Sequence, residues 1–184
     1  MRNSIQHLRA EHEKLNELIH TADDVAERVL HGEHVDSAVI RGLTDFFMLY
    51  VHGIHREKEE DILFPLLKEK GLHHNAGCVG LMLAEHDESQ EAFLTMERAS
   101  ELYEQGSEEA AHAWSRAARI YCNQLLMHLR RENEVVFYTV EHVLSAEDDA
   151  QLSVEFARVD EKARQNGIVE RLFAAEQGAR RAIA

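Results

Sequence analysis

Two segments of the sequence each carry a histidine that is followed four residues later by a glutamate. The pairs are His55 with Glu59 and His128 with Glu132. Residues i and i+4 project from the same face of a helix, about 5–6 Å apart at Cβ. Imidazole and carboxylate are both metal ligands, and a carboxylate can reach between two metal ions. A single such pair is common on solvated helix faces, so the motif needs support from elsewhere in the chain.

That support comes from a weak internal repeat. His12 and His86 each follow an Ala-Glu dipeptide and lie 74 residues apart, and the two HxxxE pairs lie 73 residues apart. Each matched polar residue interrupts an otherwise apolar helical face. A buried carboxylate is costly unless it is neutralised, paired or bound to a metal. The repeat therefore predicts a two-metal site whose candidate ligands are His12, His55, Glu59, His86, His128 and Glu132.

Helical periodicity extends over almost the whole chain, which has one proline and nine glycines. The predicted helices cover about 3–30, 36–68, 77–104, 107–144, 146–165 and 168–180, and a loop is expected at 70–75. These elements predict an all-α fold, an antiparallel up-down four-helix bundle with a helical C-terminal extension. Residues 1–145 would form the bundle and residues 146–184 the extension, packed on the same domain.

Several residues near the predicted ligands have roles that the pattern leaves open. His52, Gln90 and Tyr121 are candidates for donating or relaying a proton, but core filling is the favoured role of Tyr121. His52, one turn before His55, could also support the ligands or act as an alternative ligand. Met127 is expected in the core, and Val135 and Val136 are both expected on the inward face of His128. Three acidic residues near the first HxxxE pair, Glu57, Glu60 and Asp61, are expected to be solvated or to support the ligands. Eight other histidines are expected near helix ends, in loops or on polar faces, without a role at the site; they are His7, His20, His31, His34, His73, His74, His112 and His142.

Composition limits the partners and the compartment. The chain has 184 residues and a formal net charge of −14, so nucleic acid and anionic membranes are not expected to bind it. Its longest apolar run, residues 46–51, is too short to cross a bilayer, and the first residues lack the apolar segment of a secretory signal. Cys78 and Cys122 do not form a CxxC motif. These features predict a cytoplasmic protein, a monomer or a homodimer.

The sequence resembles hemerythrin-like proteins of the HHE cation-binding family over about residues 5–142. The resemblance rests on LRAEHE at 8–13, HREKEEDILFP at 55–65, AEHD at 84–87 and HLRRENE at 128–134. It implies a four-helix bundle that holds two iron ions with an oxo or hydroxo bridge, and it assigns the six candidate residues as the ligands.

The chain departs from the oxygen-carrying hemerythrins in its second half. Those proteins carry HxxxH on the third helix and HxxxxD on the fourth, whereas Gln90 and Asn133 stand at these positions here. The symmetric set H–HxxxE–H–HxxxE is similar to bacterial hemerythrin-like proteins of oxidative and nitrosative stress, which include iron-centre repair proteins and peroxide-decomposing members. The repair proteins usually carry a Cys-containing N-terminal module, which is not expected in this chain.

The function implied by the resemblance is that of a non-haem di-iron protein that binds or reacts with oxygen, hydrogen peroxide or nitric oxide, with peroxide decomposition favoured. It would need an electron donor that the sequence does not identify. An oxidoreductase and a non-catalytic protein that binds, senses or stores oxygen or iron both fit this centre, and zinc or manganese could occupy the same ligands. A metal-free adaptor or phosphotransfer bundle fits less well, because the matched histidines lie on apolar faces.

Overall fold

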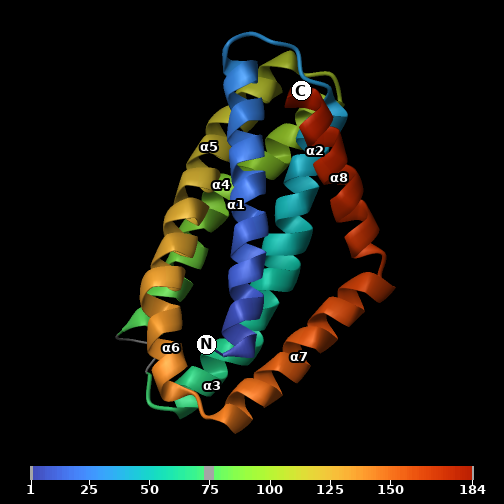
Figure 1. Ribbon diagram of the computed structural model, residues 1–184. Helices are drawn as coiled ribbons and strands as arrows, with labels where there is room; N and C mark the ends of the chain where they lie inside the picture. The colour runs from blue at the N-terminus through green and yellow to red at the C-terminus, as the bar shows by residue number, and fades with distance from the viewer. Residues whose placement is uncertain (1, 73–76, 184) are drawn as a thin grey trace.

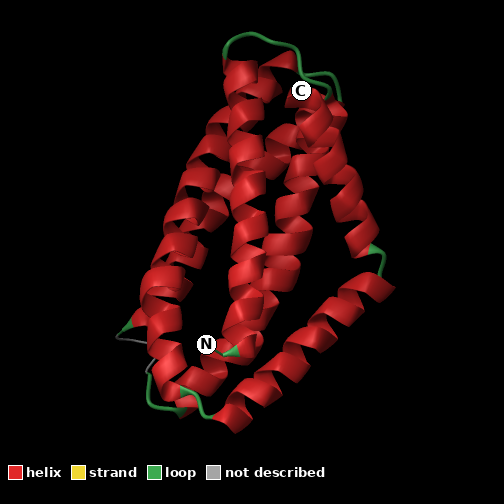
Figure 2. Ribbon diagram, viewed as in Figure 1, coloured by secondary structure: helices red, strands yellow, loops and turns green. Residues whose placement is uncertain are grey.

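The computed structural model describes residues 2–72 and 77–183, and these residues form helices with no strand (Figures 1 and 2). The predicted all-α fold is therefore confirmed. His73 and His74, with most of the predicted loop around them, lie outside the described residues. Within the described part of the chain, no helix combines the length and the apolarity that crossing a bilayer requires.

Four long rods form the bundle. The first is α1 (Asn3–Leu30), and the third is α4 (Cys78–Glu104). The second rod consists of α2 (Ser37–Phe46), the π-helical segments η1 (Phe47–His55) and η2 (Glu57–Leu63), and α3 (Phe64–Glu69). The fourth consists of α5 (Glu108–Arg131), the π-helical segment η3 (Glu132–Val136) and α6 (Phe137–Val143). Helix α5 packs against α1 and α4, and α2 packs against α4.

The interior is divided into two apolar clusters. One cluster surrounds Trp114 and Tyr121 in the half of the bundle where α2 begins. The other surrounds Phe137 and Phe156 in the half where the N-terminus lies. Between them lies a layer of fully buried polar side chains that includes Glu59. The rods are continuous across this layer, so the polar residues are held by helices that are anchored in apolar packing on both sides.

Both rods that carry an HxxxE pair contain π-helical turns there: His55 and Glu59 lie in η1 and η2, and η3 begins at Glu132, directly after α5 with His128. A π-helical turn contains an extra residue and appears mostly as a short interruption, frequently at functional sites. The wider turn in η3 corrects one expectation: Val135 is 53% exposed, whereas Val136 is fully buried. In a regular α-helix, the residue seven positions after His128 would face inward with it. Because the π-helical turn contains an extra residue, the residue eight positions after His128 faces inward instead. Met127, expected in the core, is also exposed, at 41%.

The C-terminal extension folds back along the bundle as two helices. Helix α7 (Ala146–Gln165) starts at a capping box in which Ser145 and Asp148 each accept a hydrogen bond from the other's backbone N–H. It runs diagonally across α1 and η2, and α8 (Ile168–Ile183) then continues alongside α2 to the end of the bundle where α2 begins (Figure 1). A Cβ placed on Gly42 of α2 would lie 3.4 Å from the Cα and Cβ of Ala175, so this glycine permits the close approach of α8.

Replacing Gly42 with Leu should detach α8 from α2. The atoms beyond Cβ would occupy the space of Ala175, and overpacking of this kind costs about 1–3 kcal/mol. Faster amide hydrogen exchange in residues 168–181, with unchanged exchange in α4 and α5, is the expected result. Gly42→Ala is the matched control, because a Cβ alone makes contacts of nearly ordinary length. Equal protection of α8 in both variants would contradict this assignment.

Candidate metal centre

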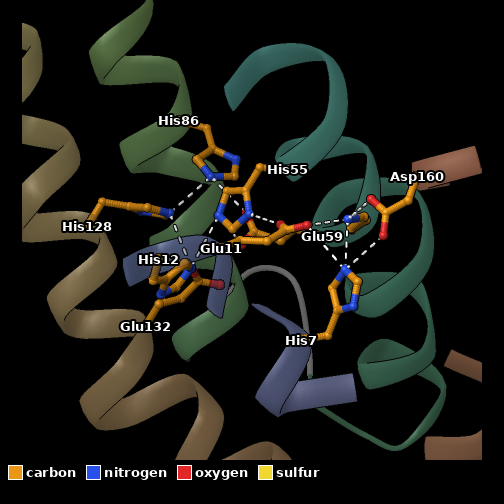
Figure 3. A network of polar contacts seen from close by, with 10 residues as sticks. His7, Glu11, His12, His55, Glu59, His86, His128, Glu132 and Asp160 are labelled. Carbon is orange, nitrogen blue, oxygen red and sulfur yellow. Dashed lines mark hydrogen bonds and ion pairs between the residues drawn. The ribbon is translucent and has the colours of Figure 1, made fainter. Parts of the chain in front are cut away.

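The six candidate ligands come from all four rods of the bundle and meet in the polar layer (Figure 3). Each is at most 4% exposed. The first rod supplies one histidine and the third another, while the second and fourth rods each supply a histidine and a glutamate. The residues are His12 on α1, His55 on η1, Glu59 on η2, His86 on α4, His128 on α5 and Glu132 on η3.

One cluster of potential ligand atoms forms between the first, second and fourth rods. The Nε2 atoms of His12 and His55 are 3.3 Å apart. Oε1 of Glu59 lies 2.9 Å from Nε2 of His55, and Oε2 of Glu132 lies 3.3 Å from Nε2 of His12. These four ligand atoms lie within 4.8 Å of one another, so they could hold a metal ion.

A second cluster lies beside the first and shares a carboxylate with it. The Nε2 atoms of His86 and His128 are 3.2 Å apart, and Oε2 of Glu59 lies 3.4 Å from Nε2 of His86. Glu59 therefore presents one oxygen to each cluster. Oε2 of Glu132 is also 3.5 Å from Nε2 of His128. The arrangement places two metal-sized groups of donors side by side with a glutamate between them.

The buried carboxylates lack the partners that a metal-free interior would require. All four carboxylate oxygens of Glu59 and Glu132 are buried, and none has a hydrogen-bond donor in suitable geometry. Burial and the charge of Glu59 raise the pKa of Glu132 well above its ordinary value. Burial opposes ionisation of Glu59 too, but the charges of His55 and His86 and the contacts with these two imidazoles together outweigh it and lower the pKa of that carboxyl. Cations between the two carboxylates would compensate both groups, so the donor set fits a metal site.

Three further carboxylates fix the outer edge of the imidazole rings. Nδ1 of His55 lies 2.8 Å from Glu11, and Nδ1 of His128 lies 3.0 Å from Glu85. Nδ1 of His86 lies 2.6 Å from Glu60. An Nδ1–H that donates to a carboxylate leaves Nε2 with a free lone pair directed inward, which is the form that binds a metal.

Glu11 and Glu85 were not among the residues predicted from the sequence. The signal was nevertheless present in the repeat, because each glutamate directly precedes a matched histidine, His12 or His86. Each contacts the histidine on the following rod of its own repeat unit: Glu11 contacts His55, and Glu85 contacts His128. Matching acidic neighbours could therefore have been read as supports for the ligands.

The three residues suggested for proton transfer have different surroundings. Nε2 of His52 lies 3.1 Å from the hydroxyl of Tyr121, which is fully buried and packs against Phe47 and Phe93. Burial lowers the pKa of His52 to about 3 and raises that of Tyr121. The neutral imidazole of His52 can therefore accept the tyrosine proton in a hydrogen bond. Gln90 is half-buried on α4 and lies four residues, about one turn, after His86.

A second polar cluster adjoins the centre through Glu11. It contains His7, Asp160 of α7 and the fully buried Lys58, and Figure 3 shows it beside the candidate ligands. Nε2 of His7 is 3.1 Å from Asp160 and 3.3 Å from Glu11. Hydrogen bonds to these carboxylates raise the pKa of His7 to about 9.

The His7 cluster predicts a pH dependence of stability. A histidine whose pKa is higher in the folded state stabilises the fold below its unfolded value, near 6.5, and loses that contribution as pH rises through about 9. The metal-free protein should lose stability across this range, as measured by urea unfolding at several pH values. His7→Gln should flatten the profile there. A His7 resonance that titrates near 6.5 by NMR would contradict the prediction.

The comparison with protein families agrees with this geometry. The model of the hemerythrin HHE cation binding domain matches residues 3–140, which include all six candidate ligands and three quarters of the chain. The comparisons with curated proteins and with solved structures give no match. The match and the two histidine–glutamate clusters support cation binding by the bundle. The chain belongs to the hemerythrin HHE cation-binding domain family.

Proposed function

We propose that the centre holds two iron ions and that the protein is a non-haem di-iron protein acting on oxygen, hydrogen peroxide or nitric oxide in oxidative or nitrosative stress, with peroxide decomposition favoured. The observation that carries the proposal is the position of Glu59, whose two oxygens face different ligand clusters. A carboxylate so placed is suited to bridging two ions. An iron pair supplies the redox chemistry that the amino-acid side chains lack.

The donor set leaves room for a small ligand. One cluster offers four donors and the other three, fewer than the six of an octahedral iron site. Apolar rings close the surroundings: His12 stacks on Phe137 with ring centroids 5.2 Å apart, and His86 stacks on Phe64 at 6.4 Å. Side chains of this kind limit the access of bulk water and of large substrates. A diatomic molecule or a peroxide is therefore the favoured class of ligand.

Proton exchange with solvent has a suitable route on one side of the centre. A shallow polar pocket is lined by His52, Arg56 and Glu60, among others. Glu60 is hydrogen-bonded to Nδ1 of His86, and Arg56 donates to the backbone oxygen of the same histidine at 3.3 Å. His52 leads from the pocket to the buried hydroxyl of Tyr121. We assign these groups to holding and passing protons during reduction of a small ligand.

Metal analysis and absorption spectroscopy test the iron pair. Protein purified in air should contain two irons per chain and show near-ultraviolet charge-transfer bands of a bridged iron pair. The double variant Glu59→Ala/Glu132→Ala should lose both the iron and the bands. A folded wild-type protein that takes up no iron, even from ferrous iron under anaerobic conditions, would overturn the proposal.

Turnover of peroxide separates the favoured function from its alternative. Catalytic release of one oxygen molecule for every two molecules of hydrogen peroxide consumed would support peroxide decomposition. Full occupancy by iron without turnover, together with a reversible spectral change under oxygen, would instead favour a non-catalytic oxygen-binding or sensing protein. The double variant without iron is the control, because free iron also decomposes peroxide.

A further inference from the structure

The internal repeat extends beyond the candidate ligands to a pair of cations. Lys58 and Arg131 lie 73 residues apart, each three residues after the histidine of an HxxxE pair. Lys58 forms an ion pair with Glu11, and Arg131 forms one with Glu85. These glutamates contact Nδ1 of His55 and of His128, respectively. Each half of the centre therefore has the same sequence of contacts, from cation to carboxylate to imidazole.

The two cations have very different surroundings. The side chain of Lys58 is 0% exposed, whereas that of Arg131 is 42% exposed. The difference arises from α7, which contacts α1 and η2 near Lys58. Asp160 of α7 accepts a hydrogen bond from Nζ of Lys58. The extension thus covers one of the two equivalent cations with a helix and a carboxylate.

Lys58 is held by two carboxylates that it shares with His7. Nζ of Lys58 donates hydrogen bonds to Glu11 and Asp160, and the protonated His7, whose Nε2 lies 3.0 Å from Nζ, pairs with the same two carboxylates. Buried networks of this kind are rigid, because no water competes for their members. Glu11 is held in turn, with Oε1 on Lys58 and Oε2 on His55. Arg131, being exposed, can exchange its contact with Glu85 for water.

We propose that α7 is a positioning element for one half of the metal centre. Asp160 fixes Lys58, Lys58 fixes Glu11, and Glu11 orients His55. The two metal ions therefore have ligands of the same types but unequal surroundings, and the ion bound by His55 is the more firmly held. This inference rests on the proposed two-iron centre, and it assigns to the extension a role that the symmetric ligand set does not reveal.

Release of iron to a ferrous chelator, combined with Mössbauer spectroscopy, tests the inference on the iron-loaded full chain. The wild-type protein should release its two irons in two phases of equal amplitude and show two quadrupole doublets of equal area. Asp160→Asn should accelerate the slow phase at least about tenfold, the lower range for loss of a partner that supports a metal ligand. It should shift one doublet only, and Asp160→Glu should restore the wild-type pattern.

Two variants separate positioning from general weakening of the fold. Lys162→Met removes an ion pair between α7 and Glu57, with Nζ 3.0 Å from the carboxylate, and should leave both phases unchanged. Arg131→Gln changes a side chain that is 42% exposed and should accelerate only the fast phase. The inference is overturned if Asp160→Asn changes neither phase or both phases equally, or if Arg131→Gln changes the slow phase. A wild-type protein with fewer than two irons would overturn the proposed function itself.

Discussion

Glu59→Gln is expected to reduce the metal content from two ions per chain to less than one. The two oxygens of Glu59 face different ligand clusters, at 2.9 Å from His55 and 3.4 Å from His86. A neutral amide keeps the shape of the side chain but removes the negative charge that both ions would share. The loss should therefore affect both ions. Elemental analysis after reconstitution with ferrous iron measures the result.

Glu57→Gln is the matched control for this prediction. Glu57 lies two residues earlier on the same rod, and its side chain is 30% exposed and paired with Lys162 of α7. It should retain two ions. Helical content measured by circular dichroism should be the same in both variants, because neither substitution changes side-chain volume appreciably. Retention of two firmly bound ions by Glu59→Gln would show that this carboxylate does not bridge.

Lys58→Met is expected to lower the free energy of unfolding of the metal-free protein by about 3–5 kcal/mol, the usual cost of removing one partner from a buried ion pair. The substitution leaves Glu11 and Asp160 facing an apolar side chain. Glu11 is 8% exposed and cannot regain its hydration. Urea unfolding of the chelated protein measures the change without a contribution from metal binding.

Lys162→Met provides the comparison for an exposed pair, and its expected cost is below about 1 kcal/mol. A second comparison removes the more buried of the two charges. Lys58→Met/Glu11→Gln should recover part of the stability lost in Lys58→Met, because Glu11 is then neutral and Asp160, whose side chain is 33% exposed, stays partly hydrated. Equal stabilities of Lys58→Met and Lys162→Met would mean that water reaches the cluster and that the buried network does not exist in solution.

The sequence predicted the bundle and the residues that meet in its interior for a specific physical reason. A carboxylate on an apolar helix face needs a cation or another polar partner. The occurrence of Glu59 and Glu132 on such faces, each four residues after a histidine, therefore indicated a metal site. The internal repeat then supplied His12 and His86. The structure brings all six side chains together, while their role as iron ligands stays a prediction.

The residues that sequence analysis misplaced or missed depend on local distortion or on distant packing. The expectation that Val135 faces inward was wrong, because periodicity assumes a regular α-helix and η3 has a wider turn. Asp160 carried no local signal, since it lies on a polar stretch of α7 and acquires its role only where that helix crosses Lys58. Helical spacing describes contacts within a rod, whereas such crossings depend on the tertiary fold.

The polar layer between the two apolar clusters has a consequence for folding cooperativity. Without cations, the layer contains buried carboxylates whose oxygens lack hydrogen-bond donors in suitable geometry, so it links the two apolar clusters less firmly than apolar packing would. Each end can then open as a separate unit, as subglobal unfolding of proteins commonly proceeds. Bound ions would connect all four rods at this level and make the molecule unfold as one. Metal loading should then raise both the cooperativity of unfolding and the resistance of the chain to proteolysis.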